Sequence, residues 1–250
     1  MRKALIFAAG LGTRLAPLTD SRPKALVELK GRALLWHVAE RLQAEGFTNL
    51  TINVHHFAGQ IKDYVSHGPF AEWAASNGIS INISDESALL LDTGGGLRKA
   101  APLIFNRDDS PVLIHNVDIL SNAHLDELYH SIGGADAMLL VSRRETSRYL
   151  LFDDQMRLRG WQNIKTGEVR PSSLKPQTSN LKTLTPLAFS GIHVVSKHMV
   201  DAMKDWPDKF GIIDFYIQNC DSLNIRGLVQ PDLKLTDIGK IDVLRALEAE

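Results

Sequence analysis

Short apolar runs alternate along the first 140 residues with segments of helical periodicity. Most of the runs are continuous, which is typical of strands buried on both faces of a sheet. In the segments between them, apolar residues recur three or four positions apart, as on the buried face of a helix. The predicted strands lie at 4–8, 50–54, 79–83, 112–117 and 138–141. The predicted helices lie at 34–42, 60–66, 97–105 and 125–132.

This alternation predicts an α/β fold with a mostly parallel sheet and helices on both of its faces. The second half of the chain is less regular. A polar stretch with three prolines at 171–186 predicts a surface excursion. Other elements are predicted there as a hairpin at 148–159, strands at 187–195 and 233–236, and helices at 212–220 and 239–248. Without a convincing linker or repeat, we expect a single domain over residues 1–250, with a sugar-binding antiparallel excursion at about 145–190.

Composition narrows the class of protein. Of 250 residues, 44% are hydrophobic and 23% are charged, as in globular proteins that bury a substantial core. The net charge of -1 argues against a general nucleic-acid binder, which is normally basic. No apolar run approaches the roughly 18 residues that span a bilayer. One cysteine fits a reducing compartment. We therefore expect a cytoplasmic protein with small-molecule partners and neither nucleic acid nor membrane as a partner; the oligomeric state stays open.

Positive charge is concentrated near the N-terminus, where residues 1–32 hold seven basic and two acidic side chains. These residues surround a glycine-containing loop after the first strand, at the end of the sheet where ligands bind in open α/β folds. Gly10 and Gly12 would let backbone amides approach phosphate oxygens, and Arg14 and Lys24 would offset their charge. A basic, solvated surface is the alternative. The loop lacks both the third glycine of a dinucleotide-binding fingerprint and the Gly-Lys-Ser/Thr ending of a P-loop.

The loop carries a longer ordered pattern. Phe-Ala-Ala-Gly-Leu-Gly-Thr-Arg-Leu-Ala-Pro-Leu-Thr at 7–19, followed by Pro23-Lys24-Ala25-Leu26, resembles the signature A-A-G-x-G-T-R-L-x-P-L-T and P-K-x-L of the sugar-1-phosphate nucleotidyltransferases. The resemblance implies a Rossmann-like three-layer α/β/α sandwich with a mixed, mostly parallel sheet. It also implies that Arg14 and Lys24 are catalytic, on the pyrophosphate and on the α-phosphate. The nucleotide-binding residues it implies in this loop are Ala8, Ala9, Gly10, Gly12 and Thr13.

Two acidic positions match the metal-binding motifs of the same family. Asp118 follows the predicted strand 112–117 within Asn116-Val117-Asp118, where the family has N-G-D, so Val117 replaces a glycine. Asp237 begins a D-x-G sequence near the C-terminus. The resemblance implies that both aspartates hold Mg²⁺, a cation that binds carboxylates, waters and phosphate oxygens. The alternative is that each aspartate only caps a helix.

Other matches concern the base and the sugar. Asp92-Thr93-Gly94-Gly95-Gly96 precedes a predicted helix and resembles the E-T-G-G-G of N-acetylmuramate 1-phosphate uridylyltransferases within the family; a tight strand-to-helix turn is the alternative. The resemblance places Thr93, Gly94 and the upstream Glu86 at the nucleotide. Phe189-Ser190-Gly191-Ile192 resembles the F-S-G-I of the same enzymes, which implies sugar binding by Ser190 and Gly191. Asn163 is a further candidate for a sugar contact.

The resemblance therefore implies Mg²⁺-dependent transfer of a nucleotidyl group to a sugar 1-phosphate, with release of pyrophosphate. UTP and N-acetylmuramate 1-phosphate are the expected pair. Other pairs stay open: GTP with a mannose- or heptose-type phosphate, dTTP with glucose phosphate, and CTP with phosphocholine. A catalytically silent nucleotide- or sugar-sensing module of the same fold is the remaining alternative.

Overall fold

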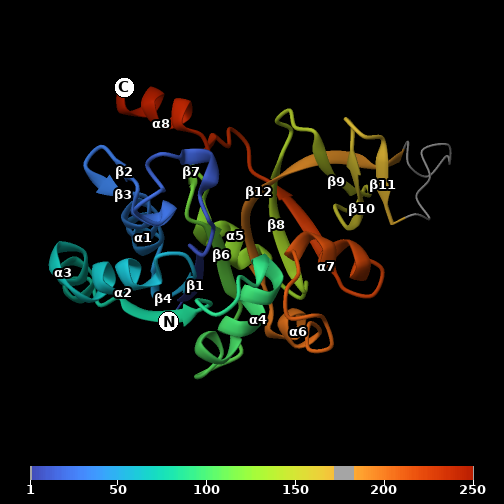
Figure 1. Cartoon of the computed structure of the whole chain (residues 1–250). Helices are drawn as coiled ribbons and strands as arrows, with labels where there is room; N and C mark the ends of the chain where they lie inside the picture. The colour runs from blue at the N-terminus through green and yellow to red at the C-terminus, as the bar shows by residue number, and fades with distance from the viewer. Residues whose placement is uncertain (1, 172–182, 250) are drawn as a thin grey trace.

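The computed structural model describes residues 2–171 and 183–249, and a ten-stranded sheet runs through them (Figure 1). Its centre is parallel. Strand β1 (Arg2–Phe7) lies between β4 (Phe47–Val54) and β6 (Val112–Asn116), and β5 (Ser80–Asp85) extends the sheet beyond β4. The chain passes from β1 to β4 on one side and later returns to β6 on the other. The crevice above β1 and β6 is thus the switch point where open α/β sheets bind ligands.

The second half of the sheet is mixed. The long strand β12 (Thr185–Val195) runs antiparallel to β6 and branches to two sets of neighbours. One set is β8 (Ala137–Ser142) followed by β13 (Ile225–Val229). The other is the antiparallel series β9 (Arg148–Phe152), β10 (Leu158–Asn163) and β11 (Glu168–Arg170). This series is the described part of the predicted excursion; residues 172–182 lie outside the described residues.

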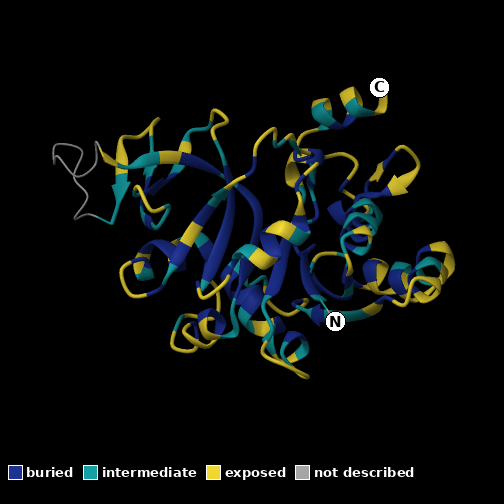
Figure 2. Ribbon diagram, turned by 180° about the vertical axis from the view of Figure 1, so that it is seen from behind, coloured by how far each residue is buried: buried dark blue, intermediate teal, exposed yellow. Residues whose placement is uncertain are grey.

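Helices cover both faces of the sheet, as predicted. Along β1, Ala4 and Ile6 belong to one hydrophobic core while Leu5 and Phe7 belong to the other, because successive side chains of a strand point to opposite faces. The first core is covered by α1 (Leu34–Ala44), α2 (Ala58–Ser66), α3 (Gly68–Ser76) and α5 (Leu125–Ser131). The second is covered by α4 (Asp92–Ile104), α6 (Lys197–Asp201) and α7 (Ile212–Asn219). Figure 2 shows the buried residues gathered in the strands between these layers. The predicted three-layer sandwich is confirmed.

Several short elements complete the chain. The N-terminal loop contains two turns of 3₁₀ helix, η1 (Thr13–Leu15) and η2 (Lys24–Leu26), and the hairpin of β2 (Glu28–Leu29) and β3 (Arg32–Ala33). Strand β7 (Ile119–Ser121) pairs with β14 (Leu235–Asp237), and α8 (Ile241–Ala249) follows. Within the described residues, no helix is both long enough and apolar enough to cross a membrane.

The start of α4 differs from the sequence-based prediction by five residues, and the helices α3 and α6 were not predicted. The sequence predicts a helix from residue 97, after the glycine triplet, but α4 begins at Asp92 and includes all three glycines. The reason is tertiary: the Phe210 carbonyl accepts hydrogen bonds from the amides of Gly94 and Gly95, at 2.9 and 3.3 Å. These amides in the first turn would otherwise lack partners, so a neighbouring segment stabilises a helix start that glycine alone disfavours.

Candidate active site

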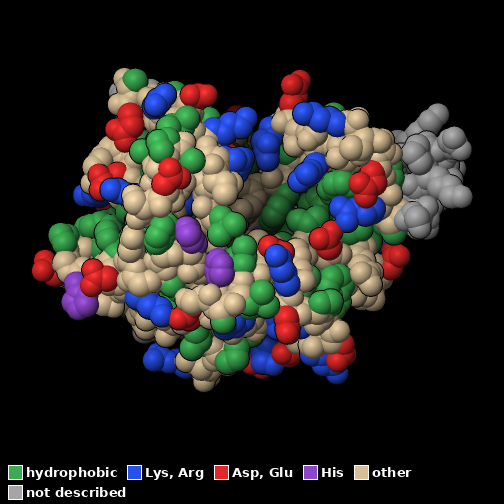
Figure 3. All heavy atoms as spheres, in the orientation of Figure 1, with side chains coloured by type: hydrophobic (Ala, Val, Ile, Leu, Met, Phe, Trp, Pro, Cys, Tyr) green, Lys and Arg blue, Asp and Glu red, His purple; other side chains and the backbone are tan. Residues whose placement is uncertain are grey.

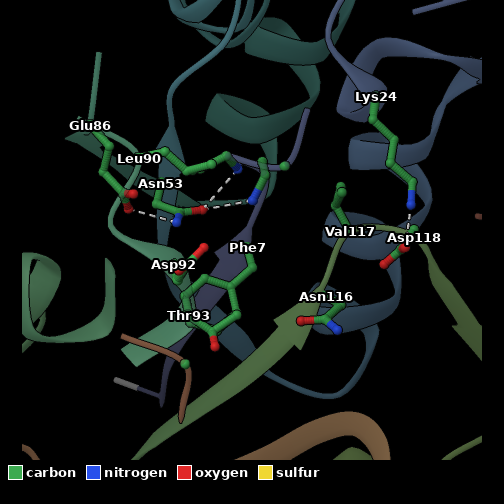
Figure 4. A pocket seen from close by; sticks show the side chains of 14 residues that line it. Phe7, Lys24, Asn53, Glu86, Leu90, Asp92, Thr93, Asn116, Val117 and Asp118 are labelled. Carbon is green, nitrogen blue, oxygen red and sulfur yellow. Dashed lines mark hydrogen bonds and ion pairs between the residues drawn. The ribbon is translucent and has the colours of Figure 1, made fainter. Parts of the chain in front are cut away.

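A cavity of about 370 Å³ lies at the carboxyl ends of the parallel strands. Each of these strands contributes to its wall at its last residue or one residue to either side of it: Phe7 from β1, Asn53 from β4, Glu86 after β5 and Asn116 from β6. The N-terminal loop, the start of α4 and Gly211 close the remaining sides. Figure 4 shows two polar groups in this wall, Lys24 with Asp118 on one side and Asn53 with Glu86 on the other.

Lys24 and Asp118 form an ion pair that is largely shielded from solvent. The lysine side chain is 10% exposed and the aspartate side chain 18% exposed. Lys24 sits on η2, whose Ala25 is buried, and Asp118 follows β6 at the neck between β6 and β7. Two predicted residues from distant parts of the chain thus meet in the cavity wall, where a cation and a carboxylate face the same space.

Arg14 and Asp237 come together near this ion pair. Strand β14 pairs with β7 so that Asp237 lies opposite Ile119, and the amide of Ile238 donates to the Asp118 carbonyl over 2.8 Å. A Cβ atom added at Gly239 would lie 2.5 Å from a guanidinium nitrogen of Arg14 and 2.6 Å from a carboxylate oxygen of Asp237. The missing side chain at Gly239 therefore leaves the space that these two charged groups occupy.

The carboxylates of Asp118 and Asp237 suit a hard cation. Oxygen donors from two aspartates, completed by water and phosphate oxygens, are the set that Mg²⁺ prefers. Among residues 2–171 and 183–249, no group of three or more histidine, cysteine or acidic side chains is arranged to hold a metal by itself. The donor set thus fits a metal that is shared with a substrate rather than one enclosed by protein.

The two glycines of the N-terminal loop, Gly10 and Gly12, have different surroundings. Gly12 has φ of 68° in the left-handed region, and a Cβ atom there would lie 2.9 Å from the Thr19 side chain and 3.0 Å from that of Lys24. The Thr19 hydroxyl donates to the Gly12 carbonyl over 2.9 Å. Gly12 thus lets the loop pass close to Lys24. Gly10 lines the cavity, has no atom within 4 Å of a Cβ added to it, and is exposed, as is Thr13.

Asn53 joins the glycine loop to the other side of the cavity. Its Oδ1 accepts hydrogen bonds from the amides of Ala8 and Ala9, at 2.7 and 3.2 Å. Its Nδ2 donates to Glu86 Oε1 over 2.8 Å, and the other Glu86 oxygen accepts from the Leu91 amide. The amides of Ala8 and Ala9 are therefore used inside the protein, and these two residues reach the cavity only with their remaining atoms.

The buried position of Glu86 changes its acidity. Glu86 is fully buried, and this burial raises the pKa of its carboxyl group, although the hydrogen bonds from Asn53 and Leu91 oppose the rise. Asn53 was not among the predicted site residues. Its signal in the sequence is a polar residue close to the end of an apolar strand, at the same edge as the predicted nucleotide loop.

At the start of α4, Thr93 and Gly94 take different positions. Thr93 lines the cavity, and its Oγ1 accepts a hydrogen bond from the Ile212 amide over 2.9 Å. Gly94 packs instead against the Phe210 ring, since a Cβ atom there would lie 2.2 Å from a ring carbon. The glycine triplet therefore serves close packing between α4 and the segment before α7, with Thr93 as its contribution to the cavity wall.

The predicted sugar-binding residues lie in three settings. Ser190 is buried, and its Oγ accepts from the Ile192 amide within the same strand. Gly191 has φ of 81°, and a Cβ atom there would lie 2.6 Å from the Asn116 amide nitrogen, so this glycine makes room for a side chain that lines the cavity. Asn163 lines a second cavity against β9–β12 and α7.

Val117, which replaces the glycine of the family motif, fits without strain. Its amide donates to the Phe7 carbonyl over 3.2 Å, which ties the end of β6 to the end of β1. It is 4% exposed, lines the cavity, and is not among the residues with positive φ. The valine therefore preserves the position of Asp118 and adds an apolar surface beside it.

The chain matches known proteins along most of its length. The family model for nucleotidyl transferases matches residues 3–202. An N-acetylmuramate alpha-1-phosphate uridylyltransferase of Caulobacter vibrioides is 31% identical over 211 residues, which cover 82% of this chain and 79% of that protein. A mannose-1-phosphate guanyltransferase of Neurospora crassa is 35% identical over 150 residues, which cover 59% of this chain and 39% of that protein.

Solved structures match the fold over the whole chain. The crystal structure of HddC from Yersinia pseudotuberculosis complexed with GMP-PN superposes with a TM-score of 0.75. The two proteins are 19% identical, and the match covers 100% of this chain and 99% of that one. This likeness supports the fold and leaves the substrates to other observations.

Proposed function

The chain belongs to the nucleotidyl transferase family, and from this premise we propose that it transfers a uridylyl group from UTP to N-acetylmuramate 1-phosphate. Family membership makes it an enzyme of the sugar-1-phosphate nucleotidyltransferase type. The observation that carries the substrate pair is the 31% identity with the Caulobacter uridylyltransferase over 82% of this chain.

The proposed reaction is a displacement at phosphorus. A phosphate oxygen of the sugar phosphate forms a bond to the α-phosphorus of UTP, and the bond between the α- and β-phosphates breaks with its electron pair leaving on pyrophosphate. Because the attacking oxygen is already anionic, the protein must mainly align two polyanions and offset their repulsion. Lys24 lines the cavity and would contact the α-phosphate and the sugar phosphate. Arg14, beside Gly239, would offset charge on the leaving pyrophosphate.

Asp118 and Asp237 would hold Mg²⁺ in this reaction. When bound, the ion neutralises phosphate charge and helps to orient the phosphates. Asp118 lies directly before β7 and Asp237 ends its partner strand β14, and Gly239 leaves space beside Asp237. The ion pair of Asp118 with Lys24 keeps the aspartate side chain fixed in the cavity wall, so that one oxygen is held by protein.

The opposite side of the cavity is proposed to bind the nucleoside. Glu86 and Thr93 line this side of the cavity, and Gly94 packs against the Phe210 ring next to Thr93. The outer part of the loop, with Gly10, Gly12 and Thr13, would surround the triphosphate. The amides of Ala8 and Ala9 anchor the start of the loop to Asn53. On the side proposed for the sugar, Gly191 would leave room for the Asn116 side chain, and Ser190 would stabilise the local conformation of β12 through its hydrogen bond with Ile192.

The test is pyrophosphate release with Mg²⁺, with five nucleoside triphosphates crossed against a panel of sugar 1-phosphates. The expected result is release with UTP and N-acetylmuramate 1-phosphate at a kcat/KM at least tenfold above any other pair. The variant Asp118→Asn serves as the catalytic control. Release with a different pair would replace the proposed substrates while keeping the reaction.

A second pair, GTP with mannose 1-phosphate, is favoured by one observation. The Neurospora guanyltransferase is 35% identical over 150 residues, which is a higher identity over a shorter part of this chain. Because the match to the uridylyltransferase covers more of this chain, GTP with mannose 1-phosphate is the second choice of substrate pair. Pyrophosphate release with GTP and mannose 1-phosphate, at a rate above that with UTP in the same panel, would reverse this order.

A further inference from the structure

The second cavity, of about 540 Å³, lies against the antiparallel part of the sheet. Strands β9, β10, β11 and β12 form one wall, and the start of α7 forms the other. None of its lining residues lines the first cavity. A different set of side chains therefore meets a ligand here.

The two cavities are connected along two elements. At the start of α7, Gly211 lines the first cavity while Ile213 and Asp214 line the second. Along β12, Phe189 lines the second cavity, and Gly191 makes room for Asn116 in the first. Figure 3 shows this face hollowed between the two halves of the molecule, with Lys and Arg side chains at the rim. The two cavities therefore lie next to each other.

Three arginines line the second cavity, and one of them is already engaged. Arg170 donates to Asp214 over 2.7 Å and lies 3.4 Å from a carboxylate oxygen of Glu168. Its guanidinium also lies over the Trp161 ring, 4.2 Å from the centroid. Two carboxylates and an aromatic face therefore satisfy Arg170, and its role in the wall is structural.

The other two arginines keep their positive charge unmatched. Arg144 donates to the Phe189 carbonyl over 3.0 Å, a neutral acceptor that fixes the guanidinium beside the cavity. The Arg148 guanidinium has no hydrogen-bond or ion-pair partner among the described residues (2–171 and 183–249), and Arg148 is exposed on the cavity wall. Arginine pairs with a carboxylate through two parallel hydrogen bonds, so such a group is the natural partner here.

We infer that Arg148, assisted by Arg144, binds a carboxylate substituent on the sugar, and that the acceptors of this enzyme are acidic sugar 1-phosphates. The inference rests on the proposed function for placing the 1-phosphate in the first cavity. Asn163 adds a neutral contact: its Oδ1 accepts from the Lys165 amide over 3.0 Å, while its Nδ2 has no partner among the described residues. A neutral sugar gives the two arginines no counter-charge and is the poorer substrate.

The test compares sugar 1-phosphates that differ in one carboxylate. N-acetylmuramate 1-phosphate differs from N-acetylglucosamine 1-phosphate by a lactyl ether that carries the acid, and glucuronate 1-phosphate differs from glucose 1-phosphate by one oxidised carbon. In Arg148→Met, the ratio of kcat/KM for the acidic member over the neutral member should fall at least tenfold. Arg148→Lys should restore part of that ratio.

Arg143→Met is the matched control, because Arg143 is exposed, its replacement removes the same charge, and it does not line the cavity. Its ratio should stay within twofold of the wild-type ratio. Since each ratio is measured within one variant, a loss of folded protein cancels. Equal ratios in wild type, Arg148→Met and Arg144→Met would overturn the inference.

The outcome separates this inference from the proposed function. Absence of turnover with UTP and N-acetylmuramate 1-phosphate, together with turnover of another pair, contradicts the proposed function. The glucuronate and glucose phosphates, used with the active nucleotide, then decide the inference alone. A preference for the acidic sugar that disappears in Arg148→Met supports it, and no such preference in the wild type overturns it.

Discussion

At the scale of single residues, Asn53 links two sides of the cavity at the strand ends through one carboxamide. Its oxygen holds the amides of Ala8 and Ala9, and its nitrogen holds Glu86. Because all these groups are buried, each loses a partner without replacement by water when the carboxamide is removed. The start of the glycine loop and the position of the Glu86 carboxyl group therefore depend on the same side chain.

The substitution Asn53→Leu keeps a side chain of similar shape and removes the hydrogen bonds of the carboxamide. Each buried polar group left without a partner costs about 1–3 kcal/mol, so the free energy of unfolding should fall by about 3 kcal/mol or more. The KM for the nucleotide should rise at least tenfold because the loop loses its anchor. Asn82→Leu is the control, since Asn82 donates to Asn49 on the neighbouring strand and does not line the cavity. Urea unfolding measures the change in stability, and steady-state kinetics measure the KM for the nucleotide. Equal nucleotide KM values in the two variants would contradict the anchoring role.

Glu86 predicts a pH dependence of stability. Burial raises its pKa in the folded protein above the unfolded value of about 4.5, so the folded state binds the proton more tightly. Stability from this group is then present at low pH and is lost as pH rises through the folded pKa. From pH 4 to pH 8, the unfolding free energy of wild type should therefore fall relative to that of Glu86→Gln. Denaturant titrations across this range measure the shift, and a difference that moves in the opposite direction would contradict the raised pKa.

At the scale of elements, the buried strands could be predicted because short continuous apolar runs between polar segments are typical of strands covered on both faces. The start of α4 could not, since glycine disfavours helix and the capping carbonyl comes from Phe210, over 100 residues away. The three-residue strands β7 and β14 behave differently. The apolar residues around β14 predict a strand there, whereas only two residues separate β7 from the end of β6, so that β7 does not stand out as a separate strand. Asn53 and Arg148 were missed for a related reason: their partners or cavities exist only after the strands pair.

Gly94→Ala tests the packing role of the glycine triplet. Alanine favours helix over glycine by about 1 kcal/mol, but its Cβ would lie 2.2 Å from a Phe210 ring carbon. Overpacking of this kind costs about 1–3 kcal/mol, so the variant should be less stable than wild type. Gly59→Ala in α2 is the matched control because no atom lies within 4 Å of its added Cβ, and it should be neutral or slightly stabilising. Thermal unfolding compares them; a stabilised Gly94→Ala would show that the segment at Phe210 moves freely.

At the scale of the whole molecule, the sheet topology brings together groups that the sequence separates widely. The loop after β1, with η2, supplies the glycines and Lys24, the junction of β6 and β7 supplies Asp118, and β14 supplies Asp237. The chain has a net charge of -1, yet Lys24, one of seven basic residues within residues 1–32, lines the cavity proposed to bind polyanions. The family motifs alone assign these residues to one site. Only the pairing of β7 with β14 explains physically why the backbone at Asp118 lies beside the backbone at residues 237–238.

This arrangement predicts that both aspartates act on the metal as a unit. Asp118→Asn and Asp237→Asn should each lower kcat by at least about 10²-fold, the scale of a lost transition-state charge interaction. Asp242→Asn is the control, because Asp242 is exposed at the start of α8 and does not line the cavity. A second readout avoids turnover: with nucleotide present, Mg²⁺ should raise the Tm of wild type and Asp242→Asn, and much less that of the other two variants. If Mg²⁺ stabilises all four proteins equally, the ion binds through the nucleotide alone, and the two carboxylates hold no metal.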